Sequence, residues 1–246
     1  MIEQEVEIPT PDGNADGWFI RPDAEGALPG VIFLADIGGI RAANLEMAAR
    51  IAAEGFSVLV PNVFYRTRRP PIWDHDFRTG GDRSAAWMAE IKGPLTPEAQ
   101  ERDGGAFVDF LAGHGFVSRG PMGVVGYCFT GGMALRIAAA RPERIGAAAS
   151  FHGVRLWSDD PASPHRLLPR ILARLYFGHA VEDRAMPEES VRGLEQALGA
   201  WGGKYESETC EGAFHSWTVP DSPVYNKAAA DRAFEKVTGL FAAALG

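Results

Sequence analysis

The sequence predicts an α/β fold in which a mostly parallel central sheet carries helices on both faces. Segments typical of strands alternate with segments of helical periodicity, and several of the strand segments are apolar at every position. A continuously apolar strand is typical of a parallel sheet that is covered on both faces. No linker or shift in composition divides the chain, so we expect residues 1–246 to form a single domain.

The first part of the chain predicts a β-hairpin or meander followed by two buried strands. Residues 4–8 and 17–21 alternate in polarity and are joined by a turn sequence, Thr-Pro-Asp-Gly-Asn. Residues 31–34 and 57–60 are apolar strands, and the helical spacing of residues 44–53 ends at Gly55. From residue 65 to about 96 the periodicity disappears, which predicts a long loop, and the sequence leaves open whether it forms a lid.

The rest of the chain repeats a strand and helix rhythm. Thr96 followed by Pro97 predicts the start of a helix that reaches about residue 112. Strands are expected at residues 122–126, 147–151, 172–177 and 204–211, and helices at 129–140, 188–198 and 226–245. Such alternation predicts a mainly parallel sheet covered on both sides.

Composition argues against several classes of protein. The net charge of −8 disfavours a nucleic-acid partner, because phosphate contacts need a basic face. No apolar run approaches the roughly 18–20 residues of a membrane span, and the acidic start lacks the apolar region of a secretory signal. Cys128 and Cys210 are too few for a disulfide scaffold. We expect a cytoplasmic protein without a membrane partner, and the sequence leaves open whether it is a monomer or a homodimer.

The most informative segment is Gly-Tyr-Cys-Phe-Thr-Gly-Gly, residues 126–132, between an apolar strand and a helix. A nucleophile elbow has this arrangement: a sharp strand-to-helix turn exposes the nucleophile, and small residues flank it two positions away. Gly126 and Thr130 occupy those positions, although glycine is usual at both. Cys128 would then lie at a helix N-terminus, where the dipole favours a thiolate. The alternative is that Cys128 is simply a small buried residue.

Partners for such a nucleophile follow in the order expected of α/β-hydrolases, acid before histidine. Asp183 lies after the strand at 172–177 and His215 after the strand at 204–211, so both fall at carboxyl ends of strands. His215 would take the thiol proton and Asp183 would orient the imidazole. Glu182 is a rival for Asp183. Five other histidines compete with His215. Two of them, His152 and His179, also follow predicted strands; the other three are His75, His114 and His165.

These motifs resemble the dienelactone hydrolase family, in which cysteine replaces the usual serine of the elbow. The resemblance runs from about residue 31 to the C-terminus and implies an α/β-hydrolase fold. It implies that the amides of Ile37 and Phe129 form an oxyanion hole. It also implies that Asp36, where the founding type carries glutamate, lies near the resting cysteine. Members that cleave dienelactone carry an arginine four residues after the histidine, and here that residue is Val219.

Residues for substrate binding are less specific in the sequence. Three aromatic residues are candidates for the walls of a pocket or for the core: Tyr65, Trp87 and Trp217. Arg66 is a candidate for binding an anionic substrate, together with its neighbours Arg68 and Arg69. The alternative for the arginines is a solvated loop. Residues 74–76, Asp-His-Asp, are more typical of a surface loop than of a metal site, and no zinc-type spacing is present. We expect no metal and no cofactor.

The resulting hypothesis is a cysteine-dependent hydrolase of small-molecule esters or lactones that acts through a Cys128-Asp183-His215 triad and an acyl-enzyme. A thioesterase or general carboxylesterase is the alternative among enzymes. A non-catalytic small-molecule-binding member of the fold is the alternative outside them, supported by Thr130 and Val219. A metal-dependent hydrolase is a more distant possibility.

Overall fold

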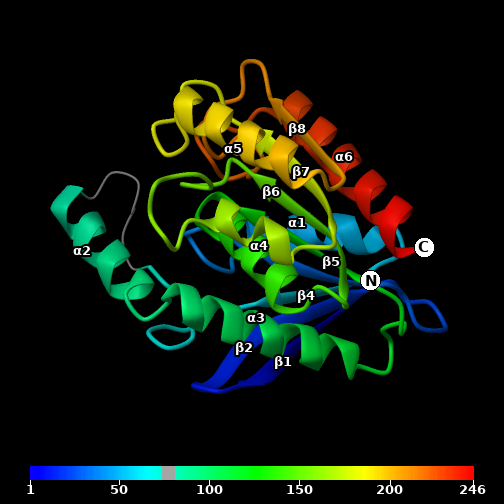
Figure 1. The fold of residues 1–246 in the computed structure, drawn as a ribbon. Helices are drawn as coiled ribbons and strands as arrows, with labels where there is room; N and C mark the ends of the chain where they lie inside the picture. The colour runs from blue at the N-terminus through cyan, green and yellow to red at the C-terminus, as the bar shows by residue number, and fades with distance from the viewer. Residues whose placement is uncertain (74–80) are drawn as a thin grey trace.

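The structure, a computed structural model, describes residues 1–73 and 81–246 and is built on an eight-stranded sheet (Figure 1). The strand order is β1-β2-β4-β3-β5-β6-β7-β8. β1 and β2 pair antiparallel, as do β2 and β4, and every later pairing is parallel. The strands span β1 (Ile2–Thr10), β2 (Gly13–Arg21), β3 (Gly30–Leu34), β4 (Ser57–Pro61), β5 (Met122–Tyr127), β6 (Ile145–Phe151), β7 (Arg174–His179) and β8 (Tyr205–Thr209).

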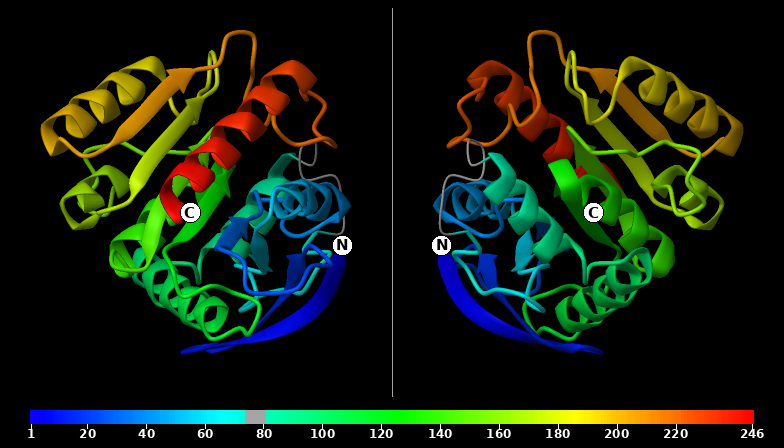
Figure 2. Two further views of the ribbon diagram at one scale, coloured as in Figure 1. Left: turned by 90° about the vertical axis from the view of Figure 1, so that its right-hand side faces the viewer. Right: turned by 90° about the vertical axis from the view of Figure 1, so that its left-hand side faces the viewer.

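Helices cover both faces of this sheet, as the sequence predicts (Figures 1 and 2). α1 (Ala42–Ala53) and α6 (Lys227–Leu245) pack on one face, over a core that contains Ile51 and Phe241. α3 (Pro97–Ala112), α4 (Gly131–Ala140) and α5 (Glu188–Trp201) pack on the other, over a core that contains Phe107 and Leu194. The central strands β3, β4 and β5 are buried at every residue, which confirms the inference from their continuous apolar runs.

The edge strand β1 differs from these central strands. Its polar positions face solvent, and three of them are glutamates: Glu3, Glu5 and Glu7. β1 pairs along its whole length with β2, residue Ile2 opposite Arg21 and Thr10 opposite Gly13, which confirms the predicted hairpin. Since only Ile8 of β1 is fully buried, this strand contributes little to the core.

One helix is missed, and several predicted boundaries differ from those of the structure. The stretch predicted as loop from 65 to 96 contains α2 (Gly81–Lys92), which buries Trp87 and Ile91. β7 begins at Arg174 rather than at residue 172, because Leu172 is 78% exposed. The helix predicted from residue 129 is a 3₁₀ turn, η1 (Cys128–Thr130), followed by α4.

A further 3₁₀ segment, η2 (Pro164–Arg170), follows β6 and packs against α4 and α5. No helix within the described residues is both long enough and apolar enough to cross a membrane.

Candidate active site

Cys128 lies at the sharp turn between β5 and α4. Its φ is +56°, in the left-handed region that non-glycine residues rarely adopt. The turn leaves no room for side chains beside it: a Cβ at Gly126 would lie 2.2 Å from the carbonyl oxygen of Thr130, and one at Gly131 would lie 2.4 Å from Ser150 Oγ. The two glycines are therefore needed for this backbone to form, which is the geometry predicted for the elbow.

Thr130, the residue where glycine was expected, is completely buried and braces the turn. Its hydroxyl accepts a hydrogen bond from the Tyr127 N–H at 3.0 Å. The same hydroxyl lies within hydrogen-bond distance of two carbonyl oxygens, at 3.0 Å from Leu34 and 2.9 Å from Tyr127, and can donate to either. The hydroxyl thus joins the ends of two neighbouring strands, β3 and β5, directly under Cys128.

His215 and Asp183 meet Cys128 at the carboxyl ends of the strands. His215 Nε2 lies 3.1 Å from Cys128 Sγ, and His215 Nδ1 lies 2.7 Å from Asp183 Oδ2. Asp183 Oδ1 accepts a hydrogen bond from the Ala185 N–H at 2.8 Å, which fixes the orientation of the carboxylate. The structure therefore brings Asp183, and not its neighbour Glu182, to the imidazole.

The electrostatic surroundings of His215 favour its protonated form. Burial lowers the pKa of His215, but the hydrogen bonds to Asp183 and to Cys128, together with the charges of those groups, outweigh burial and raise the pKa to about 10. An imidazolium facing a sulfur atom is the arrangement that stabilises a thiolate nucleophile.

The two other histidines that follow strands do not take this place. His152 is 1% exposed, its Nε2 lies 2.8 Å from Thr218 Oγ1, and its ring meets the His215 ring edge-on at 5.1 Å between centroids. Burial, and secondarily the charge of His215, lowers the pKa of His152 well below its usual value, so its ring is neutral. Burial also lowers the pKa of His179 to about 4, and its Nε2 lies 3.2 Å from Ser207 Oγ.

The remaining histidines lie away from the sulfur or outside the described structure. His114 stacks on Phe19, with 3.9 Å between ring centroids, and His165 lies 2.8 Å from Ser163 Oγ. His75, with the Asp74 and Asp76 considered as metal ligands, lies outside the described residues. Across residues 1–73 and 81–246, no three His, Cys, Asp or Glu side chains gather as metal ligands would.

A pocket of about 250 Å³ opens above Cys128 and His215. Ile37, predicted for the oxyanion hole, lines it, and Phe129 directly follows Cys128. Val219, four residues after His215 at the position discussed above for an arginine, is 1% exposed and also lines this pocket. The walls of the pocket at this end are thus apolar.

Asp36 lines the same pocket, but its carboxylate is held by Arg41 and not by Cys128. Arg41 Nη1 and Nη2 each lie 2.9 Å from an oxygen of Asp36, and the Gly38 N–H donates to Asp36 Oδ1 at 2.7 Å. Arg41 also donates two hydrogen bonds to the carboxylate of Asp221, from Nε at 2.6 Å and from Nη2 at 2.9 Å. This Asp36–Arg41–Asp221 clamp joins the loop of Ile37 to the loop that follows His215.

Sequence reasoning missed Arg41 and Asp221. They are 180 residues apart in the chain, so no local pattern connects them. The available signal was an arginine five residues after Asp36, at the start of a helix, where a cation is unfavourable without a carboxylate partner.

The four residues suggested for substrate binding lie outside the pocket at Cys128. The hydroxyl of Tyr65 lies 3.0 Å from Asp103 Oδ1, and Arg66 pairs at 2.6 Å with both Asp103 and Asp12, so its charge is neutralised. Trp217 is completely buried in the core beneath α6, and buried Trp87 donates its indole N–H to the carbonyl oxygen of Ile72 at 2.9 Å. In the structure these side chains contact carboxylates, a backbone carbonyl or the core instead of that pocket.

Comparison with known proteins gives a consistent result. The model of the dienelactone hydrolase family matches residues 15–245. A protein of Synechocystis sp. is 26% identical over 96% of this chain and 94% of its own, and the carboxymethylenebutenolidase of Rhodococcus opacus is 26% identical over 86% and 79%. The fold matches a crystal structure from Klebsiella pneumoniae with a TM-score of 0.86, at 21% identity over 98% of each chain.

Proposed function

The chain belongs to the dienelactone hydrolase family, and from that premise we propose that it hydrolyses carboxylic esters or lactones with Cys128 as nucleophile, His215 as acid and base, and Asp183 as the group that orients His215. One observation carries the proposal: an unbroken hydrogen-bonded chain from Cys128 Sγ through the His215 imidazole to Asp183, at the end of a strained elbow. Sequence order, backbone strain and distance support the same assignment independently.

In the first half of the reaction, Cys128 attacks the carbonyl carbon as a thiolate beside the imidazolium of His215. The electron pair of the carbonyl moves to its oxygen, and we assign the backbone N–H groups of Ile37 and Phe129 to the stabilisation of that oxyanion, each contributing about 3 kcal/mol. The carbon–oxygen bond to the leaving group then breaks, and His215 gives that oxygen its proton. A thioester on Cys128 and a released alcohol or enol result.

In the second half, water replaces the alcohol. Neutral His215 accepts a proton from a water molecule as the oxygen attacks the thioester carbonyl, and the carbon–sulfur bond breaks as the second tetrahedral intermediate collapses. The carboxylic acid leaves, and the imidazolium–thiolate pair is restored. The hydrogen bond of Asp183 to Nδ1 keeps Nε2 directed at the sulfur throughout.

The chemistry of the nucleophile restricts the substrates. A thiolate leaves a tetrahedral intermediate more readily than an alkoxide does, so a poor leaving group returns to substrate. We therefore propose activated esters, enol-lactones or thioesters, rather than amides. Val219 lines the pocket, and the arginine that lines it, Arg41, is already bound to two carboxylates, which favours an uncharged acyl group.

The test is pre-steady-state hydrolysis of p-nitrophenyl acetate by the wild-type protein and by Cys128→Ala. We expect a burst of p-nitrophenol equal to the enzyme concentration, lost in Cys128→Ala, because acylation of Sγ precedes the slower deacylation. Cys210→Ala is the matched control, since Cys210 is buried and burial raises the pKa of its thiol to about 11. Undiminished turnover by Cys128→Ala would contradict the proposal, and binding of the ester without turnover by the wild type would favour a non-catalytic member.

A further inference from the structure

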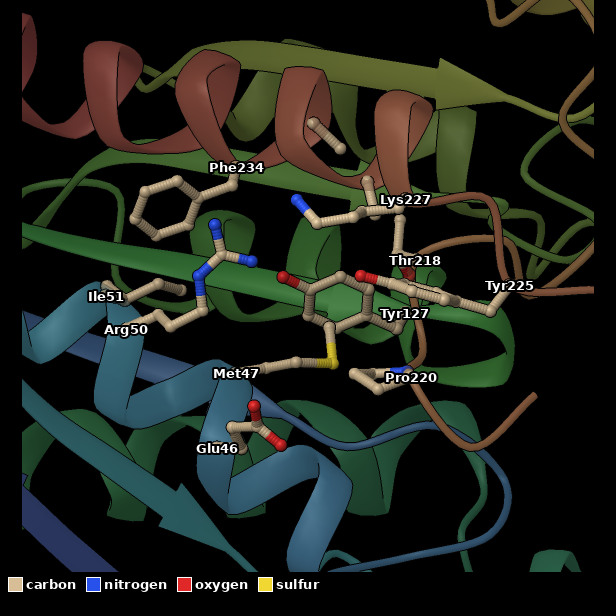
Figure 3. A pocket seen from close by; sticks show the side chains of 12 residues that line it. Glu46, Met47, Arg50, Ile51, Tyr127, Thr218, Pro220, Tyr225, Lys227 and Phe234 are labelled. Carbon is tan, nitrogen blue, oxygen red and sulfur yellow. The ribbon is translucent and has the colours of Figure 1, made fainter.

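A second cavity, of about 290 Å³, lies between α1, α6 and the loop that follows His215 (Figure 3). This loop lines both cavities: Ser216 and Val219 line the pocket at Cys128, whereas Thr218 and Pro220 line the second cavity. The volume is close to the lower end of the range of small-molecule sites, about 300 Å³. None of the residues assigned to the reaction lines it.

The walls of this second cavity combine an apolar lining with a polar end. Met47, Ile51 and Phe234 supply apolar surface, together with the small side chains of Ala230 and Ala233. Figure 3 shows the guanidinium of Arg50 and the hydroxyl of Tyr127 directed toward each other in the cavity. A ligand with an apolar body and one polar head would match both parts.

Tyr127 is the observation that points to a ligand. The residue is 4% exposed, and its hydroxyl lies at the cavity, directed toward the guanidinium of Arg50 (Figure 3). A hydroxyl and a guanidinium at one end of a cavity offer neighbouring donors to an acceptor from outside. Burial raises the pKa of Tyr127, and the hydroxyl therefore keeps its proton and acts as a donor.

The charges around Tyr127 select the type of acceptor. Arg50 lies over the Phe234 ring, 4.3 Å from its centroid, and uses only Nη2 to contact Asp231, at 3.2 Å. Lys227 adds a second cation at the cavity, also paired with Asp231. Glu46 provides the one carboxylate in the lining and disfavours a second negative charge on the ligand.

We propose that this second cavity binds a small monocarboxylate with an apolar body. The carboxylate accepts hydrogen bonds from Arg50 and Tyr127, and the apolar body contacts Met47, Ile51 and Phe234. Because neither Cys128 nor His215 takes part, the site is independent of the proposed reaction.

The test is isothermal titration calorimetry with octanoate, in the wild-type protein and in Cys128→Ala. We expect one equivalent to bind both proteins equally. Ala230→Leu fills the cavity and should raise Kd at least tenfold, whereas Ala228→Leu, on the exposed face of the same helix, should leave it unchanged. Tyr127→Phe should raise Kd about tenfold, the effect of one hydrogen bond to a charged group.

Two further measurements keep the proposal open to contradiction. Octylamine should not bind, because the cavity presents donors and cations to the polar head. If Ala230→Leu unfolds at a lower temperature than the wild type, a crystal of the wild-type protein soaked with 8-bromooctanoate locates the ligand directly by its bromine. Absence of octanoate binding at millimolar concentration, equal binding of octylamine, or bromine found only at Cys128 would each overturn the assignment.

Discussion

At the scale of single residues, the elbow shows how a threonine hydroxyl can stabilise a turn at a position where glycine is usual. Thr130 was the least typical residue of the motif, yet its side chain satisfies the Tyr127 N–H and bridges to β3. The backbone around Cys128 is strained, so these contacts stabilise a conformation that the local sequence disfavours. Thr130 thus holds the turn in place and does not argue against a catalytic role for Cys128.

We predict that Thr130→Val, which keeps the shape and removes the hydroxyl, lowers the free energy of unfolding by about 1–3 kcal/mol, because a buried N–H loses its acceptor. Urea denaturation measures this change. Thr238→Val is the control, since the Thr238 hydroxyl bonds the carbonyl oxygen of Phe234 within α6 and a helix already satisfies its own backbone. An equal loss in both variants would contradict the bracing role.

His215 makes stability depend on pH. Its pKa is raised to about 10 in the folded protein, chiefly by its bonds to Asp183 and Cys128 against the effect of burial, from about 6.5 in the unfolded chain. A raised pKa means that the folded state holds the proton more tightly, so the stabilisation is complete below pH 6.5 and is lost as the pH rises toward 10. Urea denaturation across this pH range should show that the difference in free energy of unfolding between wild type and His215→Gln decreases as the pH rises. A difference that increases with pH would refute this.

At the scale of elements, the Asp36–Arg41–Asp221 clamp fixes two loops relative to each other. Asp36 and Arg41 are 6% and 12% exposed in their side chains, so the pair lies largely out of water, whereas Asp221 is 40% exposed. Removing one partner of a buried pair leaves an uncompensated charge. The clamp therefore controls how the Ile37 amide stands relative to the His215 loop.

Arg41→Met should lower the free energy of unfolding by about 3 kcal/mol and reduce kcat more than it raises KM. Thermal melts and p-nitrophenyl acetate kinetics measure the two effects. Arg192→Met, which breaks an exposed pair with Glu188 on α5, should cost less than about 1 kcal/mol. If Arg41→Met and Arg192→Met behave alike, the clamp does not position the loops.

The elements also show where sequence reasoning ends. Strands β3, β4 and β5 could be predicted because burial on both faces requires apolar residues throughout. α2 could not, because only Ser84, Trp87 and Ile91 of its twelve residues are buried, and the prolines and glycines before it are typical of a loop. This short stripe is recognised as a helix face only beside the core residues that it contacts.

At the scale of the whole molecule, the candidate site depends on the order of strands in the sheet. Cys128, Asp183 and His215 follow β5, β7 and β8, whose carboxyl ends lie at one edge because they run parallel. Their order in the chain was therefore enough to predict that they meet. Arg41 and the second cavity depend on packing between distant segments, and no motif encodes them.

Asp103, which is completely buried in α3, pairs with Arg66 and adds an ion pair between the first third of the chain and the rest. We predict that Asp103→Asn lowers the free energy of unfolding by about 3 kcal/mol and leaves kcat unchanged, because this ion pair is structural. Denaturation and ester hydrolysis on the same preparation separate the two effects. A loss of kcat with full stability would show instead that Arg66 serves the substrate.

The glutamates of β1 have a consequence for the outer edge of the sheet. A second molecule that extended the sheet by pairing with β1 about a twofold axis would set Glu3, Glu5 and Glu7 against the same three residues of its neighbour. Like charges directly across two strands repel, and an exposed edge rich in charge resists such pairing. These charges thereby disfavour strand-by-strand aggregation at the β1 edge of the sheet.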